Sequence, residues 1–350
     1  MNILKNTNKQ SFFALDIGTT AVRVLQLEGG ELPKRLKSYA SVPIAPDTAA
    51  SESEKSGQAL QNAVLEAVKA ANISEKQVVA GFASHRIFSA VADFPSLGQK
   101  ELSKTISYQL DDYIPMPADE VKYDWSVLGP SPKNQDDVEV LITTINHEFA
   151  EKRLDLLESA GFDVIAFEPD PLGLARSLVS KDSSDPCFIV DIGHQATDLV
   201  ATIGNVPRVI RSVPIGGQTF IKTVAQNLNL EEDQAREFVF KFGMTTDKVE
   251  GRVYNALKGT ADSLVSEIQR SIKFFGDRYT QNQIQRIITS GRSSYLPNLP
   301  LYIANETGIN VEIGNPWQNT LYSSSLHNDL MSLSAEYAVA VGLGLRLEGE

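Results

Sequence analysis

The sequence predicts an α/β protein of two similar lobes, with a small α+β subdomain inserted into the first lobe. Two observations lead to this prediction. A strand–turn–strand pattern occurs twice, half a chain length apart, and residues 87–168 do not follow the pattern of the segments around them. A chain of 350 residues is also long enough for more than one compact unit.

The repeated pattern is an apolar strand, the tripeptide Asp-Ile-Gly, a short polar turn and a second strand. The copies cover residues 12–25 and 188–200. Two strands joined by a short glycine-containing loop form a β-hairpin. A glycine turn can direct several backbone N–H groups into one concavity, which binds anionic oxygens. Such a turn is also ordinary hairpin chemistry, but its recurrence favours two hairpins that hold a polyphosphate between them.

The hairpins supply the first candidate ligands. Asp16 and Asp191 end the first strand of each copy. They are the predicted Mg²⁺ residues, because Mg²⁺ prefers carboxylates and keeps much of its hydration shell. The other predicted phosphate-binding residues are Gly18, Thr19, Thr20, Gly193 and Thr197.

Two segments of the second half fit the same site. Residues 208–219 form a strand that ends in a glycine pair before a helix, and a helix N-terminus of this kind binds phosphate. Residues 287–294 form a strand that runs into a turn of small residues, which can lie flat against a planar base. Plain strand-to-helix turns remain the alternative for both.

The middle of the first half predicts the inserted subdomain. A helical pattern at 102–110 stops before Pro115 and Pro117. Two strands, a helix and a third strand follow at 123–128, 137–145, 147–160 and 164–167. The predicted first lobe comprises residues 10–86 and 169–186, the insert residues 87–168, and the second lobe residues 187–350, with 226–286 as its smaller helical subdomain.

Composition excludes several classes of function. The net charge is −12, and no basic run is long enough for a nucleic-acid surface. Four scattered histidines and the single Cys187, expected in a strand, argue against a metalloenzyme and an internal disulfide. No stretch approaches the ~18 apolar residues of a membrane span, and the polar N-terminus does not resemble a signal peptide. We therefore expect a cytoplasmic protein without direct membrane insertion.

The sequence predicts two helices in the second half of the chain. Leu264, Val265, Ile268, Ile272 and Phe275 recur at helical spacing and predict a core-facing stripe. A last helix is predicted from Ser334 to Leu345. Its glycines, Gly342 and Gly344, weaken a helix, so we expect close packing there.

These motifs resemble those of a known superfamily. The two Asp-Ile-Gly hairpins, the segment 215–217 and the segment 289–291 are similar, in order, to the phosphate and adenosine motifs of the actin-like (ribonuclease H-like) superfamily. The segment 113–121 with its following strand, and the ending that contains 315–317 and 335–346, resemble the type IV pilus assembly PilM family of the FtsA-like branch.

The resemblance implies ATP or ADP with Mg²⁺ between the lobes. It assigns Asp16, Gly18, Thr19 and Thr20 to the first phosphate hairpin and Asp191, Gly193 and Thr197 to the second. It places Gly216, Gly217 and Thr219 near the phosphates, Glu237 and Lys241 at the ribose and base, and Gly291, Arg292 and Ser293 at the adenosine. Residues 194–196 and Ser290 replace glycines of fast ATPases, so at most weak hydrolysis is expected.

The resemblance also implies a function. It describes an adaptor at the inner face of the inner membrane, which binds the cytoplasmic tail of a PilN-like protein in a groove beside the insert. The adaptor couples this complex to the motor ATPases of the pilus; whether it forms a homo-oligomer stays open.

Three other readings remain at this point. Sugar kinases share the motif at 16–20, FtsA-like proteins form filaments, and GspL-like proteins continue into a membrane helix. A kinase needs a poised carboxylate base, and the acidic end of this chain lacks the amphipathic helix of FtsA.

Overall fold

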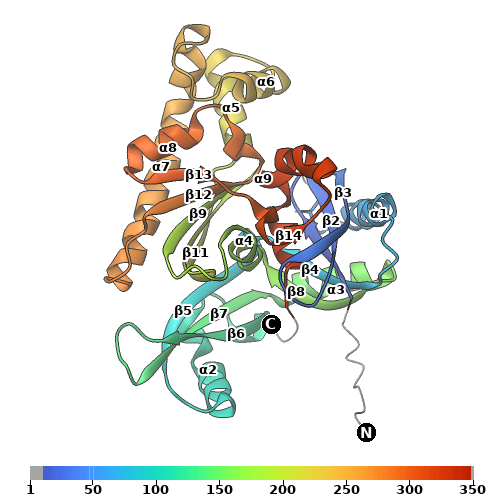
Figure 1. The fold of residues 1–350 in the computed structure, drawn as a ribbon, viewed down its shortest axis with the longest axis vertical. Coiled ribbons are helices and arrows are strands. Elements are labelled where there is room, and N and C mark those ends of the chain that lie inside the picture. Colours follow the sequence, from blue (N-terminus) through green and yellow to red (C-terminus); the bar gives the residue numbers. More distant parts are fainter. Residues whose placement is uncertain (1–10, 47, 50, 348–350) are drawn as a thin grey trace.

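The computed structural model describes residues 11–46, 48–49 and 51–347. It contains two lobes side by side, with a third, smaller sheet below them (Figure 1). Each lobe is built on one mixed β-sheet that is covered by helices on both faces.

The first lobe contains a six-stranded sheet in the order β14-β3-β2-β1-β4-β8. β1 pairs antiparallel with β2, and β2 with β3, while β4 and β8 run parallel to β1. Its strands are β1 Phe13–Ile17, β2 Ala21–Glu28, β3 Lys34–Pro43, β4 Gln77–Phe82, β8 Asp163–Pro169 and β14 Thr320–Leu321.

The second lobe repeats this arrangement. Its five-stranded sheet has the order β11-β10-β9-β12-β13, with the first three strands antiparallel and the last two parallel to β9. Its strands are β9 Pro186–Ile192, β10 Thr197–Ile203, β11 Val206–Val213, β12 Arg286–Ser290 and β13 Asn310–Ile313. The repeat read from the sequence is thus confirmed at the level of topology, and both predicted hairpins are present.

Two helices lie between the sheets and cross from one lobe to the other. α4 (Asp170–Leu178) follows the last strand of the first sheet but packs on β10 and β11 of the second. α9 (His327–Gly344) ends the second half but packs on β1, β2 and β4. The two helices contact each other closely: a Cβ on Gly342 would lie 1.9 Å from the carbonyl oxygen of Gly173. This explains the glycine that the last helix carries.

The lobe boundaries therefore differ from the predicted ones. α4, predicted with the first lobe, packs on the second sheet, and α9 and β14, predicted with the second lobe, pack on the first. Each of these elements lies where its apolar face is buried against a sheet, and for α4 and α9 that is the sheet of the other lobe. α9 also starts at His327 rather than Ser334, and the Ser334 hydroxyl donates to the Leu330 carbonyl inside the helix instead of capping it.

A helical subdomain stands at the far end of the second lobe (Figure 1). It comprises α5 (Gly217–Leu228), α6 (Glu232–Phe242) and the upper part of α7 (Arg252–Arg278). α7 buries the predicted stripe, including Leu264, Ile268 and Phe275, and reaches from this subdomain to the small sheet. Two further helices are α1 (Glu54–Ala70) on the first sheet and α8 (Leu299–Thr307) beside β13.

The insert is a three-stranded antiparallel sheet with one covering helix. The strand order is β5-β7-β6, and α2 packs on one face. Its elements are β5 Ile87–Pro95, α2 Gln99–Tyr113, β6 Val121–Pro130 and β7 Asp137–Asn146. The helix ends before the two prolines, as predicted.

The predicted insert extends too far. α3 (His147–Ser159) places Leu157 in the core of the first lobe, and β8 pairs in parallel with β4. The separate sheet therefore ends at Asn146. No helix of the described residues is long and apolar enough to cross a membrane.

Candidate functional site: a cleft between two hairpins

The two hairpin turns have the same geometry. The N–H of Gly18 donates to the Ala21 carbonyl at 3.0 Å, and the N–H of Gly193 donates to the Ala196 carbonyl at 2.9 Å. A Cβ on Gly193 would lie 2.9 Å from that same Ala196 oxygen, so a larger residue would force this turn open. The sequence repeat thus produces two equivalent tight turns, one in each lobe.

The two turns face a common cleft of about 270 Å³. Nine of the predicted ligands line it: Asp16, Gly18, Thr19, Thr20, Asp191, Gly193, Gly291, Arg292 and Ser293. Further walls come from α6, from α9 and from the turn between β4 and β5. The cleft therefore unites segments from both lobes and from both ends of the chain.

Four aspartates gather in this cleft: Asp16, Asp170, Asp191 and Asp198. Burial raises the pKa of Asp16, although Arg23 donates to its carboxylate at 3.2 Å. Burial, followed by the charge of Asp198, raises the pKa of Asp191 to about 7. Burial likewise raises the pKa of Asp198. The carboxylates thus lie in a setting that disfavours their ionised form and would favour a bound cation.

Asp170 is the functional candidate that the sequence did not reveal. It opens α4, at the end of the strand two places from β1, and burial and the neighbouring aspartates raise its pKa well above the usual value. Its Oδ1 is buried without a hydrogen-bond partner. A Cβ on Gly81 would lie 2.3 Å from this oxygen, so the close approach depends on that glycine. The feature of the sequence that could have indicated it is an acidic residue directly after a predicted parallel strand.

Four predicted phosphate residues do not line the cleft. Thr197 is fully buried, and its hydroxyl donates to the Ile215 carbonyl at 2.6 Å. The N–H of Gly217 donates to the Gly193 carbonyl at 2.9 Å, and Thr219 Oγ1 accepts from the N–H of Gly216. A Cβ on Gly216 would collide with the turn at 2.6 Å. These residues therefore support the second turn from behind.

Helix α6 lines the cleft with a different face from the predicted one. Arg236 and Phe240 line it, while Glu237 and Lys241 do not. Each lining residue precedes a predicted one by a single position, and one position turns a helical side chain by about 100°. The structure therefore places α6 at the cleft, with Arg236 and Phe240 on the side that lines it.

The predicted adenosine turn contacts the second hairpin and α9. Gly291 has φ +77°, and a Cβ there would lie 2.5 Å from the Ile192 carbonyl oxygen. The Ser293 hydroxyl donates to the Gly193 carbonyl at 3.1 Å, and the N–H of Gly291 donates to the Ala335 carbonyl. Arg292 is largely exposed, with its Nε 3.9 Å from Glu336. The turn therefore fixes this wall of the cleft and leaves a cation at its mouth.

Solved structures share this architecture. The chain from the PilM–PilN type IV pilus biogenesis complex is 25% identical, with a TM-score of 0.84 over 97% of this chain and 98% of that one. The ethanolamine utilization protein EutJ from Carboxydothermus hydrogenoformans is 11% identical, with a TM-score of 0.57 over 98% and 92% of the two chains. MreB5 of Spiroplasma citri bound to AMPPNP is 12% identical, with a TM-score of 0.56 over 95% and 94%. The fold is the actin-like one, as expected.

A family model gives the narrower assignment. The model described as "Type IV pilus assembly protein PilM" matches residues 14–348, which include nearly all of the first hairpin, the second hairpin, the insert and α9. The chain belongs to the type IV pilus assembly protein PilM family.

Proposed function

We propose that this chain is an adaptor of type IV pilus assembly, which binds an adenine nucleotide between its lobes and the tail of a PilN-like protein beside its insert. The observation that carries the nucleotide part is the pair of equivalent glycine turns facing one cleft. The partner part rests on family membership and on the likeness to the chain of the PilM–PilN complex.

The phosphates would lie between the two turns. Gly18 and Gly193 allow the backbone to approach closely, and Thr19 and Thr20 add hydroxyl donors on the first-lobe side. Arg236, Phe240 and Arg292 line the second-lobe side of the cleft and would contact the nucleoside. A nucleotide held in this way contacts both lobes, so it stabilises one relative orientation of them.

A divalent cation suits the acidic floor of the cleft. Asp16, Asp191 and Asp170 would repel a polyphosphate, and the unpartnered Oδ1 of Asp170 is an acceptor that fits the water shell of Mg²⁺. Among the residues that the structure describes, no three acidic, histidine or cysteine side chains converge closely enough to hold a metal alone. The ion would therefore rely on waters and phosphate oxygens, and Asp16 and Asp191 would contact it through water.

Calorimetric titration with ADP and ATP, with and without Mg²⁺, tests the nucleotide part. Gly18→Val should weaken binding strongly, because its Cβ would lie 3.1 Å from the Ala21 carbonyl oxygen of the same turn and 2.9 Å from Arg23 Nη1. Gly57→Ala, in the first turns of α1 with no atom within 4 Å of the new Cβ, is the control. Absence of binding in the parent protein would contradict the proposal.

Two hollows adjoin the insert and are candidates for the partner tail. One lies at the free edge of its sheet and is lined by Leu97, Trp125 and Val127. The other lies between α1 and α3 and is lined by Phe149 and Arg153, whose guanidinium group lies 5.3 Å from the ring centroid of Phe149.

A binding titration with a synthetic tail peptide distinguishes them. Val127→Asp should weaken binding if the tail occupies the sheet edge, and Arg153→Glu should weaken it if the tail lies between the helices. Ile313→Asp, at an exposed position of the second lobe, controls for surface charge. Full binding by both insert-side variants would contradict the proposed location. Attachment to the inner membrane through this tail, contact with motor ATPases and self-association belong to the same proposal and are tested by co-purification.

A further inference from the structure

Arg153 of α3 is a largely buried cation that lines a small cavity behind the first hairpin turn. The cavity has a volume of about 30 Å³. Arg153 Nη2 donates to the Ala49 carbonyl at 3.2 Å, and the guanidinium group lies 5.3 Å from the ring centroid of Phe149. Among the residues that the structure describes, Arg153 forms no ion pair with a carboxylate. Its charge is therefore not neutralised by the fold.

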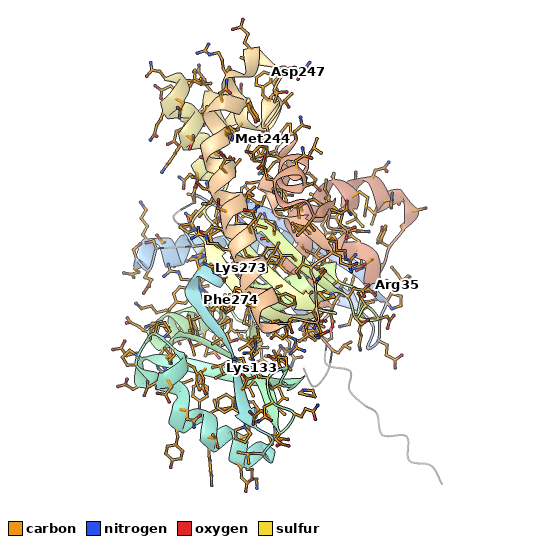
Figure 2. The ribbon with its side chains drawn as sticks, turned by 90° about the vertical axis from the view of Figure 1, so that its left-hand side faces the viewer. Arg35, Lys133, Met244, Asp247, Lys273 and Phe274 are labelled. Atoms are coloured by element: carbon orange, nitrogen blue, oxygen red, sulfur yellow. The ribbon has the colours of Figure 1, made fainter. Side chains whose placement is uncertain are left out.

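A second cation reinforces the positive character of this cavity. The guanidinium group of Arg86, which also lines the cavity, lies 4.8 Å from the same ring of Phe149. Burial, followed by the charge of Arg86, lowers the pKa of Arg153 to about 10. Lys133 and Lys273, by contrast, are exposed to water (Figure 2). A buried cation without a counterion is unfavourable, so the cavity suits an anion.

The nearest acidic side chain does not supply that anion. Glu52 is exposed, and its carboxylate lies 2.9 Å from Lys152 Nζ and 4.0 Å from Arg86 Nη1. Its charge acts on Arg153 less strongly than burial and Arg86 do. The cavity thus keeps a guanidinium group that a ligand can neutralise.

The position of the cavity indicates which anion it takes. Thr19, Ala83 and His85 line both the cavity and the cleft between the lobes, so the two hollows adjoin each other at the first turn. The cavity has room for about two water molecules, and a planar guanidinium presents paired N–H donors that match two oxygens of a phosphate.

We propose that this cavity is an oxyanion site for phosphate, which is bound by the guanidinium group of Arg153. The site goes beyond the proposed nucleotide binding, because it lies behind the turn rather than between the two turns. The phosphate comes either from solution or from the terminal group of a nucleotide in the cleft, and the test separates these sources.

Thermal unfolding in phosphate, against chloride of equal ionic strength, tests the site in protein saturated with ADP. Phosphate should raise the Tm of the parent protein, because a ligand of the folded chain stabilises it. Arg153→Met should lose this increase, with phosphate affinity weakened at least about tenfold. Arg153→Lys keeps the charge without the paired donors and should retain part of it. Lys152→Met removes an exposed cation at the next position and should respond like the parent.

The comparison is between Tm shifts, so a change in the stability of a variant by itself does not affect the outcome. Absence of a phosphate-dependent shift in the parent overturns the inference. An equal shift in Arg153→Met also overturns it, because phosphate then binds elsewhere. The assay contains no peptide, and ADP binding is measured separately. A protein that does not bind ADP contradicts the proposed function alone, since the phosphate shift is then measured without nucleotide.

The source of the phosphate follows from one further arm, in which a non-hydrolysable ATP analogue replaces ADP. If the site is filled from solution, the phosphate-dependent shift should persist. If the site takes the terminal group of the nucleotide, the analogue should remove that shift in the parent and should itself stabilise the parent more than Arg153→Met. Both results support the site, and an analogue that removes the shift without this difference between the proteins overturns it.

Discussion

Asp170 is surrounded by other acids and has an oxygen without a hydrogen-bond donor. A buried carboxylate in this position binds a proton more readily in the folded than in the unfolded chain. Its contribution to stability therefore falls as the pH rises above the unfolded pKa of about 4. A buried carboxylate without a partner lowers the stability of the fold, and such groups are typical of ligand-binding sites.

Asp170→Asn should stabilise the protein without ligand. We expect an increase of about 1–2 kcal/mol in the free energy of unfolding at pH 8. The increase becomes smaller toward pH 4, because the buried aspartic acid is then neutral in the folded protein, like the asparagine that replaces it. Urea unfolding at the two pH values measures it. Asp182→Asn, on the exposed loop after α4, should change neither value. A destabilised Asp170→Asn at pH 8 would contradict this account of the cleft.

Asp191 should make Mg-nucleotide binding depend on pH. Because its pKa is raised to about 7, a cation must displace a proton below that pH. We expect affinity to rise about tenfold from pH 6 to pH 8, with proton release visible as a dependence of the calorimetric heat on the buffer. Asp191→Asn should bind more weakly and lose the steeper part of the pH dependence; an identical pH profile would refute the assignment.

At the scale of elements, the packing of α4 on α9 determines which side chains line the cleft between the lobes. α4 brings Asp170 and α9 brings Glu336 to the same cavity, and their axes approach so closely that glycines occupy the contact. Such a contact has no room for a methyl group, whereas a glycine on an exposed helix face has room.

Gly342→Ala should therefore destabilise the fold by about 3 kcal/mol, because the new Cβ meets the backbone oxygen of Gly173, which cannot rotate away. Gly276→Ala, on α7 with no atom within 4 Å of the new Cβ, should stabilise by about 0.5–1 kcal/mol through helix propensity. Chemical unfolding of both variants gives the comparison. Equal effects of the two substitutions would show that α4 and α9 can separate freely.

At the scale of the whole molecule, charged contacts join the insert to the second lobe. The buried Glu139 accepts hydrogen bonds from Arg208, Arg278 and Tyr279, and Asp93 accepts one from Arg278. Removing one member of a buried ionic group leaves the others without compensation.

Glu139→Gln should lower the free energy of unfolding by about 3 kcal/mol, since Arg208 and Arg278 lose their shared carboxylate. Glu312→Gln breaks an exposed pair with Arg286 and should cost less than about 1 kcal/mol. Thermal and urea unfolding compare the two. A change of similar size in both variants would mean that the insert is held by apolar packing rather than by this cluster.

The sequence alone determined the features that depend on neighbouring residues. Both hairpins, their glycine turns, the buried stripe of α7 and the end of α2 before the prolines follow from local hydrogen bonds and spacing. The order of these motifs also identified the fold and the family. Nine of the candidate ligands line the cleft because they belong to the turns or to the strand ends beside them.

Only the tertiary structure decided what depends on rotation and on distant packing. Arg236 and Phe240 of α6 line the cleft, one position before Glu237 and Lys241, which the resemblance had placed there, because the rotation of a helix is set by its packing. Asp170 joins the aspartates of the hairpins because parallel strands end at one edge of the sheet. α9 and β14 complete the first sheet, and α3 and β8 extend it, because burial of apolar faces, and not proximity in sequence, determines where each element lies.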